Sequence, residues 1–145
     1  MKLELKHLAP YLPYGLQMYC ETMNGLETFK WTLLPNNIED VLGFQNKPRL
    51  RPLSDLTENI NLHDDFYAVP IENMTGYKLD GSISDAPITV KHLYGCSKGK
   101  IKAKFLDYWV ITQLLEWHFD VFGLIPEGLA LDYNDFSEFN KRFMP

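Results

Sequence analysis

The chain has 145 residues, of which 46% are hydrophobic and 14% aromatic, and its formal net charge at pH 7 is −5. This length fits a single domain, 1–145, and the aromatic content excludes a disordered chain because aromatic side chains gain much on burial. The acidic balance disfavours a protein that coats duplex nucleic acid, since such proteins are usually basic.

The first part of the chain predicts a helical turn, a loop and a hairpin. Residues 3–8 allow one short turn of helix, and two prolines in the loop 9–15 then stop it. Residues 16–21 alternate apolar and polar side chains, as a half-buried strand does, and 26–34 are the expected partner strand. The Asn-Gly pair at 24–25 favours a tight turn between them.

The next segments predict short elements separated by polar loops. Residues 40–44 suggest a third strand. Residues 50–58 carry a helix start signal, because Ser54 or Asp55 can accept hydrogen bonds from free N–H groups of the first turn. Residues 61–65 read as a polar loop.

Strands are expected again between residues 66 and 104. Segments 66–69 and 88–94 are apolar or β-branched, and 97–99 predicts a turn. Beyond this point every second residue is a lysine: Lys98, Lys100, Lys102 and Lys104. In a strand, that spacing places all four ammonium groups on one face.

Residues 107–122 predict the one long helix, because apolar residues recur at three- and four-residue spacing. The side chains expected to be buried are Val110, Leu114, Leu115, His118 and Phe122. Gln113 and Glu116 are expected to be exposed. Gly123 follows where a left-handed residue ends a helix, so we expect a positive φ there. A last short helix is predicted at 136–143.

Together these elements predict an α+β fold, in which a small antiparallel sheet or partly open barrel packs against one long C-terminal helix, about 107–122. The charged N-terminus is unlike a signal peptide, and the apolar runs are far shorter than the ~20 residues of a membrane helix. We therefore expect a cytoplasmic location, in a bacterial or infected host cell. Cys20 and Cys96 lack zinc-site spacing and are expected to be reduced thiols.

Three sequence blocks are distinctive as a set. They read LAPYLPYGL at 8–16, LRPLSDL at 50–56, and WHFDVFGLI at 117–125 followed by GLA at 128–130. The set resembles an uncharacterised family of small proteins from Bacteroidetes genomes, often in prophages and mobile elements. The resemblance implies a phage or mobile-element setting, and it implies no catalytic residues.

Two groups of polar residues invite a chemical interpretation. His118 and Asp120 lie about 200° apart around a helix, so they cannot hold one ligand from the same turn. A core histidine bonded to a backbone carbonyl is the ordinary explanation of His118. Residues 63–65, His-Asp-Asp, could bind a divalent cation, although such neighbours in a loop are usually solvated.

A thiol nucleophile is a further candidate, because His92 precedes Cys96 by four residues. A strand would hold the two roughly 13 Å apart, although a turn could shorten that distance. Neither a phosphate-binding glycine loop nor a nucleophile elbow occurs. We therefore predict no catalytic residues, no metal site and no cofactor.

Charge and aromatic residues suggest three surfaces. The lysine row predicts either an edge strand protected from aggregation or a strip that binds a phosphate-bearing ligand, nucleic acid or an acidic partner. Arg49 and Arg51 form a second basic pair, for which a structural contact to Asp55 is the alternative. Tyr11 and Tyr14 could present a partner-binding surface or cover the core.

The leading functional hypothesis is a non-enzymatic phage or mobile-element protein that binds a host or phage protein. The alternative is a phage anti-defence protein that sequesters an anionic nucleotide-type ligand. A minor metal-dependent enzyme is the second alternative. Neither nucleic acid nor a membrane is an expected partner. The predicted binding residues are Lys98, Lys100, Lys102, Lys104, Arg49, Arg51, Tyr11 and Tyr14.

Overall fold

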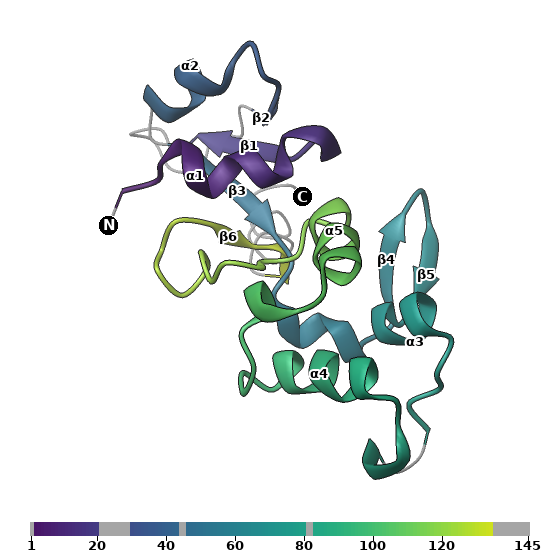
Figure 1. Cartoon of the computed structure of the whole chain (residues 1–145). Coiled ribbons are helices and arrows are strands. Elements are labelled where there is room, and N and C mark those ends of the chain that lie inside the picture. The colour runs from purple at the N-terminus through teal and green to yellow at the C-terminus, as the bar shows by residue number, and fades with distance from the viewer. Residues whose placement is uncertain (1, 21–29, 44–45, 81–82, 135–145) are drawn as a thin grey trace.

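The computed structural model describes residues 2–20, 30–43, 46–80 and 83–134, and Figure 1 shows how their elements are arranged. In the following, η denotes a 3-10 helix. The first elements are α1 (Leu5–Leu8), η1 (Ala9–Tyr14), β1 (Gln17–Cys20), β2 (Lys30–Thr32), α2 (Ile38–Gly43), β3 (Asn46–Leu50), η2 (Leu53–Thr57), β4 (Ile60–His63) and β5 (Phe66–Ala68). The remaining elements are α3 (Pro70–Thr75), η3 (Ile83–Asp85), α4 (Ile88–Ser97), η4 (Ala103–Phe105), α5 (Tyr108–Glu116) and β6 (Leu131–Asp132). This mixture of helices and strands is consistent with the predicted α+β class.

The larger sheet has the strand order β2-β1-β3-β6. β1 pairs antiparallel with β2, with Met18 opposite Trp31, so the two predicted hairpin strands are confirmed. The turn predicted at 24–25 lies outside the described residues. β3 pairs antiparallel with β1, but β6 pairs parallel with β3. The sheet is therefore mixed, and not wholly antiparallel as predicted.

A second sheet consists of the antiparallel hairpin β4-β5, which stands apart from the larger sheet in Figure 1. The predicted polar loop at 61–65 is wrong, because residues 61–63 belong to β4. Only Asp64 and Asp65 form the turn, and both have positive φ, 45° and 63°. Tight hairpin turns need such left-handed residues, and aspartate tolerates them better than most side chains. The strand predicted at 66–69 is confirmed as β5.

Two predicted strands are helices in the structure. Residues 38–43 form α2 where a strand was expected at 40–44, and 88–97 form α4 where one was expected at 88–94. In α4 the buried residues include Val90, Leu93 and Ser97, which share one helical face. That face packs against η2, and this contact outweighs the preference of its β-branched residues for strands.

The predicted long helix is also corrected, since α5 ends at Glu116. The stop is His118, whose φ of 61° is left-handed. Two hydrogen bonds close the end: Phe119 N donates to Leu114 O (2.9 Å), and His118 N donates to Leu115 O (3.0 Å). This is the Schellman arrangement, which usually uses glycine at the left-handed position.

Glycine ends α4 in the same way. Gly99 has φ 74°, its N–H donates to Cys96 O (3.1 Å), and Lys100 N donates to Gly95 O (2.9 Å). The turn predicted around residues 97–99 is thus a helix terminus. Gly123 has the predicted positive φ, 72°, but it lies in the loop beyond α5 and does not end the helix.

Burial along α5 follows the predicted periodicity as far as the helix extends. Three side chains are buried as predicted: Val110, Leu114 and Leu115. His118 and Gln113 are half-buried, and Glu116 is exposed. Phe122 is 39% exposed, so its predicted burial is wrong, whereas Phe119 is fully buried. The exposure of Phe122 and the burial of Phe119 both differ from helical spacing because α5 ends before these two residues.

One cluster of buried side chains collects residues from distant parts of the described chain. Its fully buried members include Leu8 in α1, Leu50 in β3, Leu56 in η2 and Leu114 in α5. α5 packs against η1, and α3 and α4 both pack against η2. The 3-10 helices η1 and η2 are therefore packed against the α-helices of the fold. The helix predicted at 136–143 lies outside the described residues.

We expect Leu114→Ala to lower the free energy of unfolding by about 2–5 kcal/mol, because Leu114 has no solvent exposure and its loss leaves a cavity. Glu116→Ala is the control on the same helix, where an exposed substitution should change stability by less than about 0.5 kcal/mol. Urea unfolding followed by circular dichroism measures both. Equal stability of the two variants would contradict the core position of α5.

Candidate functional site

The three sequence blocks at 8–16, 50–56 and 117–130 meet around the loop 117–125. Tyr11, in η1, is fully buried, and its hydroxyl donates to Phe119 O (2.6 Å). The hydroxyl oxygen of Tyr11 also accepts a hydrogen bond from Val121 N (3.3 Å). The partner-surface prediction for Tyr11 is therefore wrong, because its side chain covers the core and closes the loop. Burial raises the pKa of the Tyr11 hydroxyl, so it stays protonated and can donate.

His118 makes the second contact between the loop and η1. Its Nε2 lies 2.6 Å from the carbonyl oxygen of Tyr14, which requires the Nε2–H tautomer. Burial lowers the pKa of His118 and thereby favours the neutral ring. This is the core-histidine role expected as the alternative to catalysis. Tyr14 is half-buried, and its role in partner binding stays a prediction.

Arg51 connects the middle block to the same loop. Its N–H donates to His118 O (2.8 Å), and its carbonyl oxygen accepts from Asp120 N (2.9 Å). Its Nε donates to Trp117 O (2.9 Å). Three hydrogen bonds from one residue hold the chain after β3 beside the chain after α5, where a parallel bridge joins Arg51 and Phe119.

The carboxylate of Asp120 binds backbone N–H groups of the same loop. Its two oxygens accept hydrogen bonds from Leu124 N (2.7 Å) and Ile125 N (2.9 Å). Burial raises the pKa of Asp120, and these backbone donors oppose that shift. The expected position of Asp120 near a helix C-terminus is corrected, because it lies in the loop past the end of α5. Its geometry indicates a structural role.

A groove of about 430 Å³ opens between β3, η2, β4 and the residues after β6. The polar and aromatic residues that line it include Arg49, Arg51, Asp55, Asn61, Tyr133 and Asn134. Arg49 and Arg51 are two residues apart on an extended chain and so project to the same side. The groove therefore brings together the predicted basic pair.

The guanidinium groups of both arginines lie over one aromatic ring, that of Tyr133. The guanidinium carbon of Arg49 lies 3.5 Å from the centroid of the Tyr133 ring, and that of Arg51 lies 4.3 Å from it. Cations over an aromatic face are attracted by its quadrupole. The parallel pairing of β6 with β3 carries Tyr133 to this place. Sequence reasoning missed Tyr133, because only the sheet pairing joins it to the arginines.

Asp55 lies in the same groove and does not cap a helix. η2 begins after Pro52 without a side-chain cap, so the capping prediction for Ser54 or Asp55 is wrong. The Asn134 amide donates weakly to both carboxylate oxygens of Asp55, at 3.3 and 3.4 Å. Burial raises the pKa of Asp55, whereas the Asn134 amide and the charge of Arg51 lower it. Asp55 is thus a counter-charge to Arg51.

The suggested cation-binding residues 63–65 have other roles. His63 stacks on Phe66, with ring centroids 5.3 Å apart, and the two aspartates form the hairpin turn. Within the part of the chain that the structure describes, we find no group of three or more His, Cys, Asp or Glu residues that could hold a metal ion.

Cys96 is a buried, free thiol in α4. Burial raises its pKa to about 11, so the thiol stays protonated at neutral pH. His92 is exposed on the same helix. The strand assumed for this pair is absent, and the raised pKa gives no support to an activated nucleophile.

The lysine row is not a strand. Lys98 is the C-cap of α4, and η4 occupies 103–105, so neither the one-face alternation nor the protected strand edge exists. The ammonium groups of Lys98 and Lys104 lie 5.2 Å from the ring centroids of Tyr94 and Phe105. All four lysines are exposed. The first two lie at the C-terminal end of α4, where positive charge is favourable.

Exposed aromatic residues follow the lysines directly. Phe105, Tyr108 and Trp109 are 75%, 84% and 51% exposed. We call the set Lys98, Lys100, Lys102, Lys104, Phe105, Tyr108 and Trp109 the lysine–aromatic surface. Sequence reasoning missed its aromatic part, because Tyr108 and Trp109 were simply included in the start of the predicted helix. The signal was present as a cluster of aromatic residues beside a cluster of lysines.

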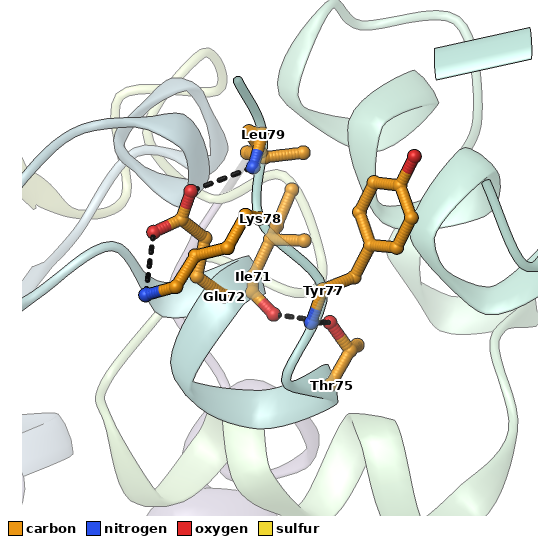
Figure 2. Close-up of polar contacts among 6 residues, drawn as sticks. All are labelled: Ile71, Glu72, Thr75, Tyr77, Lys78 and Leu79. Carbon is orange, nitrogen blue, oxygen red and sulfur yellow. Dashed lines mark hydrogen bonds and ion pairs between the residues drawn. The ribbon is translucent and has the colours of Figure 1, made fainter. Parts of the chain in front are cut away.

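The C-terminal end of α3 is fixed by side-chain contacts, shown in Figure 2. Glu72 accepts a hydrogen bond from Leu79 N (2.7 Å) and pairs with Lys78 (3.8 Å). The hydroxyl of Thr75 accepts from Tyr77 N (3.2 Å). These contacts fold the chain back after α3, so both carboxylate oxygens of Glu72 have a structural role.

No protein-family model, curated protein or solved structure matches the chain. Among the described helices, none has the length and apolar character needed to cross a bilayer.

We expect Tyr11→Phe to lower the free energy of unfolding by about 1–2 kcal/mol, because two buried backbone groups lose their hydroxyl partner. The cost is limited because Val121 N also donates to Phe119 O (2.9 Å). Tyr108→Phe removes an exposed hydroxyl and is the matched control. Denaturant unfolding that gave the same value for both variants would contradict the role of the Tyr11 hydroxyl.

His118 should make stability depend on pH. Its pKa in the folded state lies below the unfolded value of about 6.5, so between these values only the unfolded chain binds the proton. The contribution of neutral His118 to the free energy of unfolding is fully present above about pH 6.5. It is lost as the pH falls towards the pKa of the folded state.

Unfolding free energies measured from about pH 7.5 to 5 test this expectation. His118→Gln should flatten the decrease on acidification, whereas His92→Gln, on the exposed face of α4, should leave it unchanged. A parallel offset of the His118→Gln curve, with the same slope as the wild-type curve, would show that another group is responsible.

Proposed function

We propose that the chain is a non-enzymatic binding protein that docks an acidic protein partner on the lysine–aromatic surface. The observation that carries this proposal is the exposure of Phe105, Tyr108 and Trp109 in the segment 98–109, which also carries four exposed lysines. The proposal concerns binding alone, and it assigns no reaction to the chain.

The aromatic residues supply the apolar part of the contact. Burying a large apolar side chain is worth about 1.5–3 kcal/mol, and this gain is still available at Tyr108 and Phe105 because both are mostly exposed. Tyrosine and tryptophan are also common at the centres of protein interfaces, where they carry much of the binding energy. The chain buries other aromatic residues fully, such as Tyr11 and Phe119.

The lysines indicate the charge of the partner. The whole chain carries a net charge of −5, yet four of its basic residues fall within 98–104. A basic surface on an acidic protein attracts an acidic partner locally and orients it during association. Nucleic acid fits less well, because its extended negative charge would also meet the acidic remainder of the protein.

The resemblance of the three blocks to proteins of prophages and mobile elements supports a biological setting. In that setting the partner is a protein of the phage or of its bacterial host, and the complex forms in the cytoplasm. The resemblance concerns residues 8–16, 50–56 and 117–130, none of which belongs to the lysine–aromatic surface. The docking surface is therefore a proposal about this chain and not about the family.

Photocrosslinking in the producing cell can identify the partner. A benzophenone amino acid at Phe105 should crosslink an acidic protein, whereas the same amino acid at Tyr67, an exposed aromatic residue in β5, should not. Crosslinks of equal yield at both positions would indicate non-specific contact. Crosslinks at Phe105 to nucleic acid would overturn the proposed class of partner.

We expect Tyr108→Ala to weaken binding of the crosslinked partner by about tenfold or more, because interface aromatic residues often contribute at least 1.4 kcal/mol. Lys100→Gln with Lys102→Gln should weaken binding and reduce its salt dependence, while stability changes by less than about 0.5 kcal/mol. Tyr67→Ala is the control. Titration calorimetry at two salt concentrations measures these effects, and wild-type affinity in both test variants would refute the surface.

A further inference from the structure

We propose that the groove at Arg49, Arg51 and Asn61 is a separate binding site for a small ligand that combines a phosphate monoester with hydrogen-bond donors, as a nucleoside monophosphate does. The groove shares no residue with the lysine–aromatic surface. Its volume, about 430 Å³, falls within the roughly 300–1,000 Å³ of small-molecule sites.

The arginines form the phosphate end of the site. Arg51 is held by the bond from its Nε to Trp117 O, and both guanidinium groups contact the Tyr133 ring. They are thus positioned before a ligand arrives, which reduces the entropy lost on binding. Guanidinium groups bind phosphate and carboxylate through paired N–H donors. A phosphate monoester offers three terminal oxygens to two guanidinium groups, whereas a carboxylate offers only two.

Asn61 indicates the other half of the ligand. Its Oδ1 is buried in β4, and within the described chain no donor bonds to it. Buried acceptors are rarely left without a donor, and a simple anion cannot supply one. A hydroxyl or amino group of the ligand can. Asp55, on the η2 wall, is a second acceptor for such groups.

The charges of the groove make it selective for a composite ligand. Asp55 lies near Arg51 and offsets part of its positive charge, and Asp64 also lines the groove. An isolated anion therefore meets two acidic side chains as well as the two arginines. A composite ligand can place its phosphate against the arginines and its hydrogen-bond donors against Asn61 or Asp55. It then contacts both the basic end and the acceptor end of the groove. We expect inorganic phosphate to bind more weakly than a nucleoside monophosphate for this reason.

Titration calorimetry on the full chain tests the site with defined probes. The probes are the four common ribonucleoside monophosphates, their nucleosides, ribose 5-phosphate and inorganic phosphate. At least one monophosphate should bind at least tenfold more tightly than both its nucleoside and inorganic phosphate. Absence of binding by all four monophosphates at millimolar concentration would overturn the proposal, as would equal binding of phosphate and monophosphates.

Variants locate the binding in the groove. Arg49→Gln should weaken monophosphate binding at least tenfold, and Arg49→Lys should recover only part of it because lysine lacks the paired donors. Asn61→Leu should weaken binding of the monophosphate but not of inorganic phosphate. Lys78→Gln, an exposed residue outside the groove, is the control. Circular dichroism confirms the fold of each variant.

The two proposals can fail separately. Tyr108→Ala should leave monophosphate binding unchanged, and Arg49→Gln should leave the affinity for the protein partner unchanged. The groove site would be overturned if the double variant Lys100→Gln with Lys102→Gln lost monophosphate binding while Arg49→Gln and Asn61→Leu kept it. That result would place the phosphate on the lysine–aromatic surface.

Discussion

The buried backbone of residues 117–121 is the constraint on which the rest of the structure depends. This segment leaves a helix inside the core, where each unpaired N–H or C=O group is costly. The Tyr11 hydroxyl bonds to Phe119 O and Val121 N, and the backbone of Arg51 bonds to the residues on either side of Phe119. Segments from three distant parts of the chain thereby become a single unit.

Both proposed binding surfaces depend on this unit. The bonds of Arg51 to the loop fix the end of β3 and so hold the arginines of the groove, while parallel β6 brings Tyr133 to them. The left-handed turn at His118 ends α5 and directs the chain back to η1. α5 then keeps its inner face in the core, and the aromatic residues at its start remain exposed.

The sequence by itself determined features that rest on local chemistry. The pairing of β1 with β2 follows from the alternation of residues 16–21, and the burial of Leu114 follows from helical spacing. Gly123 has the expected positive φ because glycine alone adopts it without strain. For the groove, the sequence identified Arg49 and Arg51 as a basic pair but gave no sign of Tyr133.

Only the tertiary structure decided features that depend on distant contacts. Residues 88–97 are helical because one face packs on η2, although their β-branched residues favour a strand. The end of α5 at His118 could not be read locally, because its side chain finds the Tyr14 carbonyl only in the folded chain. The lysines between 98 and 104 alternate as in a strand, yet they lie at the end of α4, in the loop that follows it and in the 3-10 helix η4. Local propensities differ by about 1 kcal/mol or less per residue, so packing against the core outweighs them.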